Sequence, residues 1–181
     1  AAPRPDRPGP PRGQTATGRG VDRVASPPVP LAYHPGMLKT LALPDRVRAF
    51  IAAPGRFATL ATLDPSGAPW QAIVWYRLDP DGMLMVNSAN GRRWPANLRR
   101  DARVALAIAE PGDGYHWVGL LAEVAEIVDD QAVAQADIAD LAHRYHPDDP
   151  AEVTASVARF QAQQRVTFRL RPTSFHDHLD E

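Results

Sequence analysis

Residues 69–103, PWQAIVWYRLDPDGMLMVNSANGRRWPANLRRDAR, contain the strands, the turn and the basic loop around which the rest of the chain is arranged. Residues 70–78 are rich in Trp, Val, Ile and Tyr, and residues 83–88 form a second apolar run, as β-strands commonly do. Between them, residues 79–82 have the Asp, Pro and Gly composition of a hairpin turn. The two strands are therefore predicted to pair antiparallel.

A basic loop follows the second strand and leads into a short predicted helix. Arg92 and Arg93 precede Pro95, and proline is favoured at the first helical position because its missing N–H would have no partner there. Unpaired N–H groups at a helix start, together with arginines, attract an anion. We interpret this loop as the phosphate site of a cofactor. The alternative interpretation is a solvated basic turn, since arginines are common on surfaces.

The segments on either side of this stretch extend it into a barrel. Strands joined by hairpins, with helices grouped before and after them, predict a mainly β (α+β) fold, an antiparallel barrel with peripheral helices. The predicted elements are a helix over 41–53, a first strand over 57–63, strands over 103–109 and 115–128, helices over 130–145 and 151–163, and a closing strand over 165–170.

The first 40 residues differ in composition from the rest. They hold nine of the nineteen prolines and six basic residues against two acidic ones. Such a segment buries too little apolar surface to offset the entropy lost on ordering. We expect a disordered Pro/Arg-rich extension over 1–40, one barrel domain over 41–175 and a flexible tail over 176–181. A targeting peptide or a tether to an anionic surface is a second interpretation of the extension.

Composition and charge disfavour several classes of protein. No run of about 18 apolar residues predicts a transmembrane helix, and the start of the chain lacks the apolar core of a secretory signal. The chain has no cysteine, so we expect no disulfide, no thiolate metal site and a cytoplasmic location. The net charge of −1 and the +4 of the extension leave about −5 on the remaining residues. A folded body of that charge is not expected to bind nucleic acid.

Two groups of histidines have spacings that a metal site could use. They are His143 with His146 near a predicted helix end, and His176 with His178 close to the end of the chain. Histidines at helix ends and in tails have simpler explanations, so no metal site is predicted. The chain also lacks the short motifs of serine hydrolases, of P-loop proteins and of dinucleotide-binding proteins.

Residues 44–175 resemble a known family. The segments that carry the resemblance are FATLATLDPSGAPWQAIVWYRLD at 57–79, NSANGRRWPANLRRDARVALAI at 87–108 and GYHWVGLLAEVAEI at 114–127. They are similar to the split β-barrel proteins of the pyridoxamine 5′-phosphate oxidase-like superfamily, and most closely to its flavin- and deazaflavin (F420)-dependent oxidoreductases. The resemblance implies an FMN-binding split-barrel fold and a homodimer with the cofactor in a groove between the subunits.

The resemblance also implies roles for particular residues. By it, the cofactor ring lies along one strand, the phosphate lies at the basic loop, and three residues approach from the partner subunit. The ring-lining residues would be Gln71, Ala72, Ile73, Val74 and Trp75, and those near the phosphate Ser88, Asn90, Arg92, Arg93 and Trp94. Asn97 would brace the short helix, and Tyr115, His116 and Trp117 would come from the partner. Apart from the resemblance, the position of His116 between two aromatic residues makes it a candidate proton donor, and the alternative is that it only forms part of the wall.

Two residues depart from the pattern of the family. Trp94 stands where relatives commonly carry a lysine that faces the phosphate, and Leu121 stands where relatives often carry an arginine. We expect an oxidoreductase in which reduced coenzyme F420 delivers a hydride to an activated C=C or C=O bond of a small organic substrate. The alternatives are an FMN-dependent oxidase or reductase, and a non-catalytic barrel that holds haem or a flavin.

Overall fold

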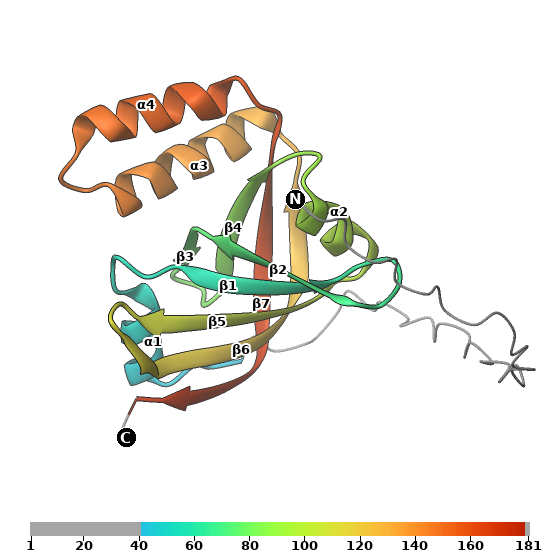
Figure 1. Ribbon diagram of the computed structural model, residues 1–181, viewed down its shortest axis with the longest axis vertical. Coiled ribbons are helices and arrows are strands. Elements are labelled where there is room, and N and C mark those ends of the chain that lie inside the picture. The colour runs from blue at the N-terminus through green and yellow to red at the C-terminus, as the bar shows by residue number, and fades with distance from the viewer. Residues whose placement is uncertain (1–40, 180–181) are drawn as a thin grey trace, which may run out of the picture. The chain divides into compact units, whose positions relative to one another are not determined.

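The computed structural model describes residues 41–179, which form one curled antiparallel sheet of seven strands and four helices (Figure 1). The strand order is β2-β1-β5-β6-β7-β4-β3. This half-barrel confirms the predicted fold class, whereas the expected extension over 1–40 lies outside the described residues. The elements are α1 (Asp45–Ala52), β1 (Ala58–Leu63), β2 (Pro69–Val74), β3 (Tyr76–Leu78), β4 (Leu84–Ala89), α2 (Arg93–Arg100), β5 (Arg103–Glu110), β6 (Asp113–Val128), α3 (Gln131–Tyr145), α4 (Pro150–Gln161) and β7 (Arg165–His178).

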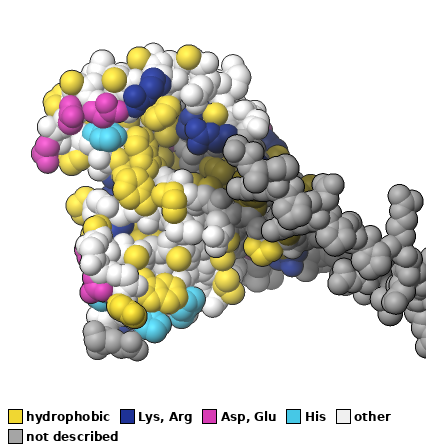
Figure 2. All heavy atoms as spheres, in the orientation of Figure 1, with side chains coloured by type: hydrophobic (Ala, Val, Ile, Leu, Met, Phe, Trp, Pro, Cys, Tyr) yellow, Lys and Arg dark blue, Asp and Glu magenta, His cyan; other side chains and the backbone are white. Residues whose placement is uncertain are grey.

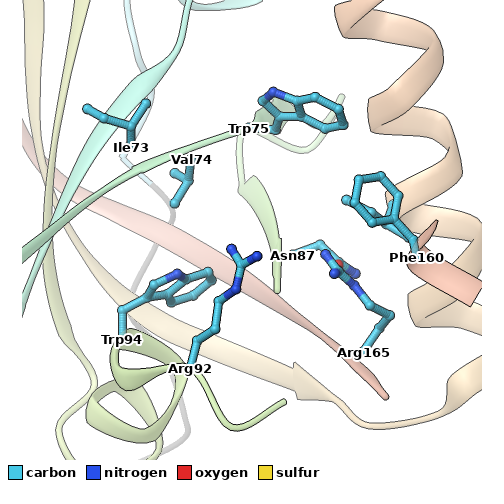
Figure 3. A pocket seen from close by; sticks show the side chains of 9 residues that line it. Ile73, Val74, Trp75, Asn87, Arg92, Trp94, Phe160 and Arg165 are labelled. Carbon is cyan, nitrogen blue, oxygen red and sulfur yellow. The ribbon is translucent and has the colours of Figure 1, made fainter. Parts of the chain in front are cut away.

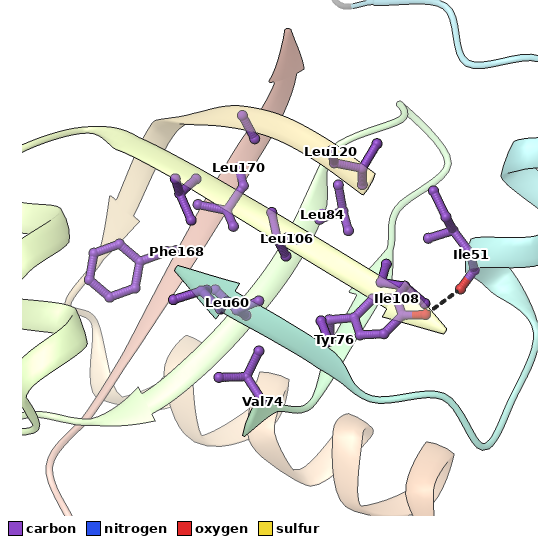
Figure 4. Packing of buried hydrophobic residues seen from close by; sticks show 14 of the residues in the cluster. Ile51, Leu60, Val74, Tyr76, Leu84, Leu106, Ile108, Leu120, Phe168 and Leu170 are labelled. Atoms are coloured by element: carbon purple, nitrogen blue, oxygen red, sulfur yellow. Dashed lines mark hydrogen bonds between the residues drawn. The ribbon is translucent and has the colours of Figure 1, made fainter. Parts of the chain in front are cut away.

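The core lies on the inner face of the curled sheet. Burial alternates along β1 and β5, as expected for strands with one face on a core. The hydroxyl of Tyr76 donates a hydrogen bond of 2.9 Å to the carbonyl oxygen of Ile51 and so ties α1 to the sheet (Figure 4). The apolar side chains that meet inside include Leu60, Val74, Leu84, Leu106, Ile108, Leu120, Phe168 and Leu170.

The strand predicted over residues 70–78 is interrupted at Trp75. Its first part, β2, pairs with β1 from Ala58–Val74 to Leu63–Pro69. Only its second part, β3, pairs with β4, and the turn between these two is closed by Gly82 N–H on the Asp79 carbonyl oxygen at 2.9 Å. The prediction of one long hairpin was therefore wrong in its first half, because the chain changes partner strand at Trp75.

Helix α2 begins at Arg93, with Arg92 as its N-cap. The predicted start at Pro95 was wrong, because Pro95 is the third helical residue. Proline is tolerated there since the N–H groups of the first helical turn have no partner within the helix. The loop between β4 and α2 spans only Asn90 to Arg92, shorter than predicted, and both arginines lie at the helix start.

The closing strand extends well beyond residue 170. β7 pairs with β4 through its first part and with β6 along its whole length, up to the pair Trp117–His178. The domain end predicted at residue 175 therefore falls inside this strand, and residues 176–178 belong to the sheet. The predicted strand ended at Leu170 because residues 171–178 are mostly polar, although Phe175 still packs on the core.

Helices α3 and α4 form a hairpin that lies at one end of the sheet (Figure 1). The side chain of Asp130 caps α3 by accepting from Val133 N–H at 3.0 Å, and Asp149 caps α4. Ile138 and Leu141 pack on Met85 of β4. Among the described residues, no helix combines the length and apolar character that crossing a bilayer requires.

Candidate functional site

A cleft of about 170 Å³ lies where the β2–β3 junction, the start of α2 and the α3–α4 hairpin meet (Figure 3). Its walls combine apolar side chains with two arginines and one amide, and no carboxylate is among them. The apolar lining residues are Ile73, Val74, Trp75, Trp94, Ile138 and Phe160, and the polar ones are Asn87, Arg92 and Arg165.

The two arginines come from opposite sides of the cleft. Arg92 precedes α2, whereas Arg165 begins β7 and is only 3% exposed. The Arg165 Nε donates to Asn87 Oδ1 at 2.9 Å, and its Nη1 donates to Gln163 Oε1 at 2.7 Å. Burial, and then the positive charge of Arg92, lower the pKa of Arg165 to about 10, so the Arg165 guanidinium is still cationic at neutral pH.

Aromatic rings form the wall of the cleft on the side of the helical hairpin. The rings of Trp75 and Tyr145 are stacked with centroids 4.9 Å apart, and Phe160 meets Trp75 edge-on at 5.9 Å. The Tyr145 hydroxyl accepts from Tyr76 N–H at 3.1 Å and donates to the Arg56 carbonyl oxygen at 2.7 Å. Burial raises the pKa of Tyr145, which keeps the hydroxyl protonated and able to donate.

Replacing Tyr145 with phenylalanine is expected to lower the free energy of unfolding by about 1–3 kcal/mol. The substitution leaves the backbone groups of Tyr76 and Arg56 without their partner, and an unpaired buried polar group carries that cost. Urea unfolding measures it. Tyr115→Phe is the matched control, because Tyr115 is 90% exposed; equal effects of the two substitutions would contradict this role of Tyr145.

Five of the residues predicted to bind the cofactor line the cleft. They are Ile73, Val74, Trp75, Arg92 and Trp94. The first three come from the β2–β3 junction, so the interruption that the sequence did not predict turns Trp75 toward α3 and α4. Trp94 is 4% exposed and its ring lies 5.6 Å from that of Phe168. It is therefore part of the core as well as of the cleft wall.

Arg93 is not among the residues that line the cleft of a single chain, and its predicted contact with the phosphate stays a prediction. Its guanidinium carbon lies 4.2 Å from the ring centroid of Trp70, and its Nη2 is 3.3 Å from Asp64 Oδ2. Because α2 starts at Arg93, this side chain leaves the helix in a different direction from that of Arg92. We therefore leave Arg93 out of the cleft.

Three further residues of the predicted phosphate site form hydrogen bonds near the cleft without lining it. The hydroxyl of buried Ser88 donates to the carbonyl oxygen of Ala89 at 3.1 Å. Asn90 donates its backbone N–H to the Gln164 carbonyl oxygen at 2.7 Å. The Asn97 amide donates to Thr62 Oγ1 at 3.0 Å and thereby joins α2 to β1. None of their side chains is among the lining residues.

The other predicted residues lie outside the cleft of a single chain. Gln71 and Ala72 precede Ile73 on β2. His116 meets Phe50 edge-on at 5.2 Å and its Nδ1 is 3.7 Å from Glu110 Oε2. Tyr115, His116 and Trp117 were expected to act on a partner's cleft, and this part of the hypothesis stays a prediction.

Asn87, Ile138, Phe160 and Arg165 line the cleft but were not predicted to do so. Ile138 and Phe160 follow the apolar period of α3 and α4, which indicates burial without indicating a ligand. Arg165 is a lone basic residue at the start of a strand, and such a residue does not by itself indicate a ligand site. Only the pairing of β7 with β4, which sets Arg165 opposite Ala89, brings it to the basic loop.

Within residues 41–179, no group of three His, Asp or Glu side chains is arranged to hold a metal ion. His176 and His178 instead contact Trp117, one ring edge-on at 4.9 Å and the other stacked at 5.0 Å. Figure 2 shows histidine side chains in two places, one near acidic side chains at the end of the helical hairpin and one beside hydrophobic side chains at the opposite end.

Comparisons with known proteins agree on the architecture. Residues 43–178 match the family model described as pyridoxamine 5′-phosphate oxidase. Similar solved structures include an F420 reductase (24% identity, TM-score 0.59, 74% of this chain and 98% of the other). A conserved hypothetical protein of Mycobacterium tuberculosis has 23% identity and a TM-score of 0.59, over 78% of this chain and 89% of the other. The haem storage protein of Vibrio cholerae has 16% identity and a TM-score of 0.53, over 76% of this chain and 95% of the other. A comparison with curated proteins found no match.

Proposed function

Because the chain belongs to the pyridoxamine 5′-phosphate oxidase family, we propose that it is an oxidoreductase that binds a flavin-type cofactor in this cleft. The observation that carries the proposal is the composition of the cleft, in which aromatic and apolar side chains stand beside two arginines without a carboxylate. We place coenzyme F420 first and FMN second. Structural similarity to an F420 reductase supports this order.

The residues present fit the chemistry of such a cofactor. A flavin or deazaflavin has a planar ring system and a phosphate, and its ring requires an apolar or aromatic surface. The β2–β3 junction supplies that surface through Ile73, Val74 and Trp75. The arginine at the start of α2 supplies a cation next to the unpaired N–H groups of a helix start, where a phosphate is stabilised.

The cofactor supplies hydride transfer, and the protein supplies binding, orientation and electrostatics. Arg92 holds the anionic end of the ligand, while the main chain of β2 and the ring of Trp75 hold the apolar end. No described side chain of the cleft is a general acid or base. The substrate proposed is a small organic molecule with an activated C=C or C=O bond.

We further propose that the active form is a homodimer. The outer face of β2, β1, β5 and β6 carries Ala61, Ala105 and Ala107 in paired positions. Two large apolar side chains are markedly exposed on it, Ile73 at 67% and Leu121 at 53%. A volume of about 170 Å³ is below the roughly 300–1,000 Å³ of typical ligand sites. Ile73 belongs to both the outer face and the cleft, so a second copy packed on this face would complete the cleft.

Equilibrium titration of the purified protein with F420, FMN and haem tests the proposal. Binding of F420 at concentrations well below those needed for FMN is expected. Binding of FMN alone would assign the enzyme to flavin chemistry instead. A haem Soret band without affinity for either flavin type would show that the cleft has a non-catalytic, haem-binding role.

Arg92→Ala is expected to weaken cofactor binding by about 1.5–3 kcal/mol, which is about ten- to a hundredfold in Kd. The guanidinium of Arg92 is exposed toward the cleft, so the substitution removes a charge-assisted contact with little effect on folding. Fluorescence titration measures Kd. Arg93→Ala is the matched control, because it removes the same charge one residue away but outside the cleft. Equal loss in both variants would contradict the assigned site.

A further inference from the structure

Arg165 is buried without a counter-ion. Both hydrogen bonds of its side chain go to neutral side-chain oxygens, those of Asn87 and Gln163. Within residues 41–179, no carboxylate forms an ion pair with it, and no acceptor takes a hydrogen bond from its Nη2. A cation removed from water without an opposite charge carries a cost of several kcal/mol. The protein therefore maintains an unfavourable charge at this wall of the cleft.

Arg92 adds to this imbalance. Figure 3 shows the side chains of Arg92 and Arg165 both reaching into the cleft, from α2 and from the start of β7. The charge of Arg92 is close enough to disfavour the charge on Arg165. Two like charges that face one space repel each other unless an anion lies between them. No residue that lines the cleft provides this anion.

We propose that Arg165 is the principal anion-binding residue of the cleft, and that Arg165 and Arg92 together hold one phosphate group of the ligand. The identity of the ligand rests on the proposed function, whereas the anion site follows from the charges alone. A phosphate oxygen accepts from the free Nη2 of Arg165, and other oxygens of the same group accept from Arg92. Guanidinium groups suit this geometry because they donate two parallel hydrogen bonds. Arg165 thus takes the part that the sequence suggested for Arg93.

The α3–α4 hairpin holds Arg165 in position. Gln131 of α3 accepts from Arg165 N–H at 2.9 Å and donates to its carbonyl oxygen at 2.8 Å. The ring centroid of Phe160 in α4 lies 4.9 Å from the guanidinium carbon. Asn87, which orients the guanidinium, also donates to the Ala134 carbonyl oxygen in α3 at 2.8 Å. A phosphate bound at Arg165 is therefore expected to strengthen the attachment of the hairpin to the barrel.

Inorganic phosphate tests the anion site without any cofactor. The full-length wild-type protein, Arg165→Gln and Arg93→Gln are compared by thermal unfolding over a phosphate series, with chloride at equal ionic strength as reference. Phosphate is expected to raise the Tm of the wild type and of Arg93→Gln alike. For Arg165→Gln, the phosphate concentration needed for the same shift should rise about ten- to a hundredfold. Equal shifts in wild type and Arg165→Gln would overturn the proposal.

Pairs of ligands with and without phosphate separate this inference from the proposed function. Kd is measured for FMN against riboflavin, and for F420 against its phosphate-free deazaflavin riboside. In each pair, the phosphorylated ligand should bind more tightly to the wild type than the phosphate-free one. Arg165→Gln should lower this ratio of affinities about ten- to a hundredfold and leave the Kd of the phosphate-free ligand unchanged. If the ratio of affinities is the same in Arg165→Gln as in the wild type, the inference is overturned while the proposed function stands. Phosphate protection that depends on Arg165, without binding of either cofactor, would support the inference and refute the proposed function.

If Arg165→Gln does not fold, Arg165→Lys replaces it in the phosphate-binding test. This variant keeps the charge but loses the guanidinium fork that reaches Asn87 and the ligand together. Phosphate binding about tenfold weaker than in the wild type is expected. Binding as tight as in the wild type would overturn the proposal.

Discussion

Leu121→Asp is expected to convert the proposed homodimer into a monomer. Leu121 is 53% exposed on the outer face of β6, opposite Ala105 of β5 and Ser174 of β7, and a two-fold interface would bury both copies of the substituted side chain. An unpaired charge buried in this way costs about 3–5 kcal/mol, which weakens the dimer by more than about a hundredfold. Analytical ultracentrifugation across a concentration series measures the change. Cofactor affinity should fall with it, because the partner subunit is proposed to complete the cleft.

Val133→Asp is the control for this experiment. Val133 is 43% exposed, but it lies on α3 and not on the outer face of the sheet. It should leave the sedimentation of the protein unchanged. If the wild-type protein is a monomer, or if Leu121→Asp stays dimeric, the proposed interface is refuted.

Phe168→Ala is expected to lower the free energy of unfolding by about 3–5 kcal/mol. Phe168 is fully buried on β7, where it faces Val86 of β4 on one side and Ile127 of β6 on the other. Removing the ring leaves a cavity in the middle of the sheet and deprives Trp94 of the ring it packs against. Urea denaturation of the wild-type and variant proteins measures the loss.

Tyr115→Ala removes an aromatic ring of similar size from the surface, where Tyr115 is 90% exposed. It should change the free energy of unfolding by no more than about 0.5 kcal/mol. A similar loss in both variants would show that β7 is not the centre of the core.

Much of the fold follows from local pattern. Alternating burial marks β1 and β5, and Asp130 starts α3 with a side-chain cap as its position in the sequence suggests. The interruption at Trp75 does not follow from this pattern, because residues on both sides of Trp75 are mainly apolar and apolar content does not report which strand is the partner. The early predicted end of β7 has a different cause, because residues 171–178 contain few apolar side chains.

The site was partly predictable for a different reason. Arg92 stands in a segment whose strand, loop and helix order suggests an anion site on local grounds. Arg93 carries the same charge in the same segment, but its side chain contacts Trp70 and Asp64 outside the cleft of a single chain. Arg165 lies 73 residues from Arg92 by their numbers, so its place in the cleft depends on the pairing of β7 with β4. Long-range pairing of that kind has no local signature.

The interruption at Trp75 lies where the two edge strands of the sheet are joined in the chain. β2 and β3 are the first and last strands of the sheet order, yet one residue separates them in the chain. The covalent chain therefore links the two edges of the curled sheet at Trp75. The N–H of the next residue, Tyr76, donates a hydrogen bond to the Tyr145 hydroxyl of α3. Trp75 itself has no partner in either ladder. The cleft that it lines therefore lies beside a break in the hydrogen bonding of the sheet.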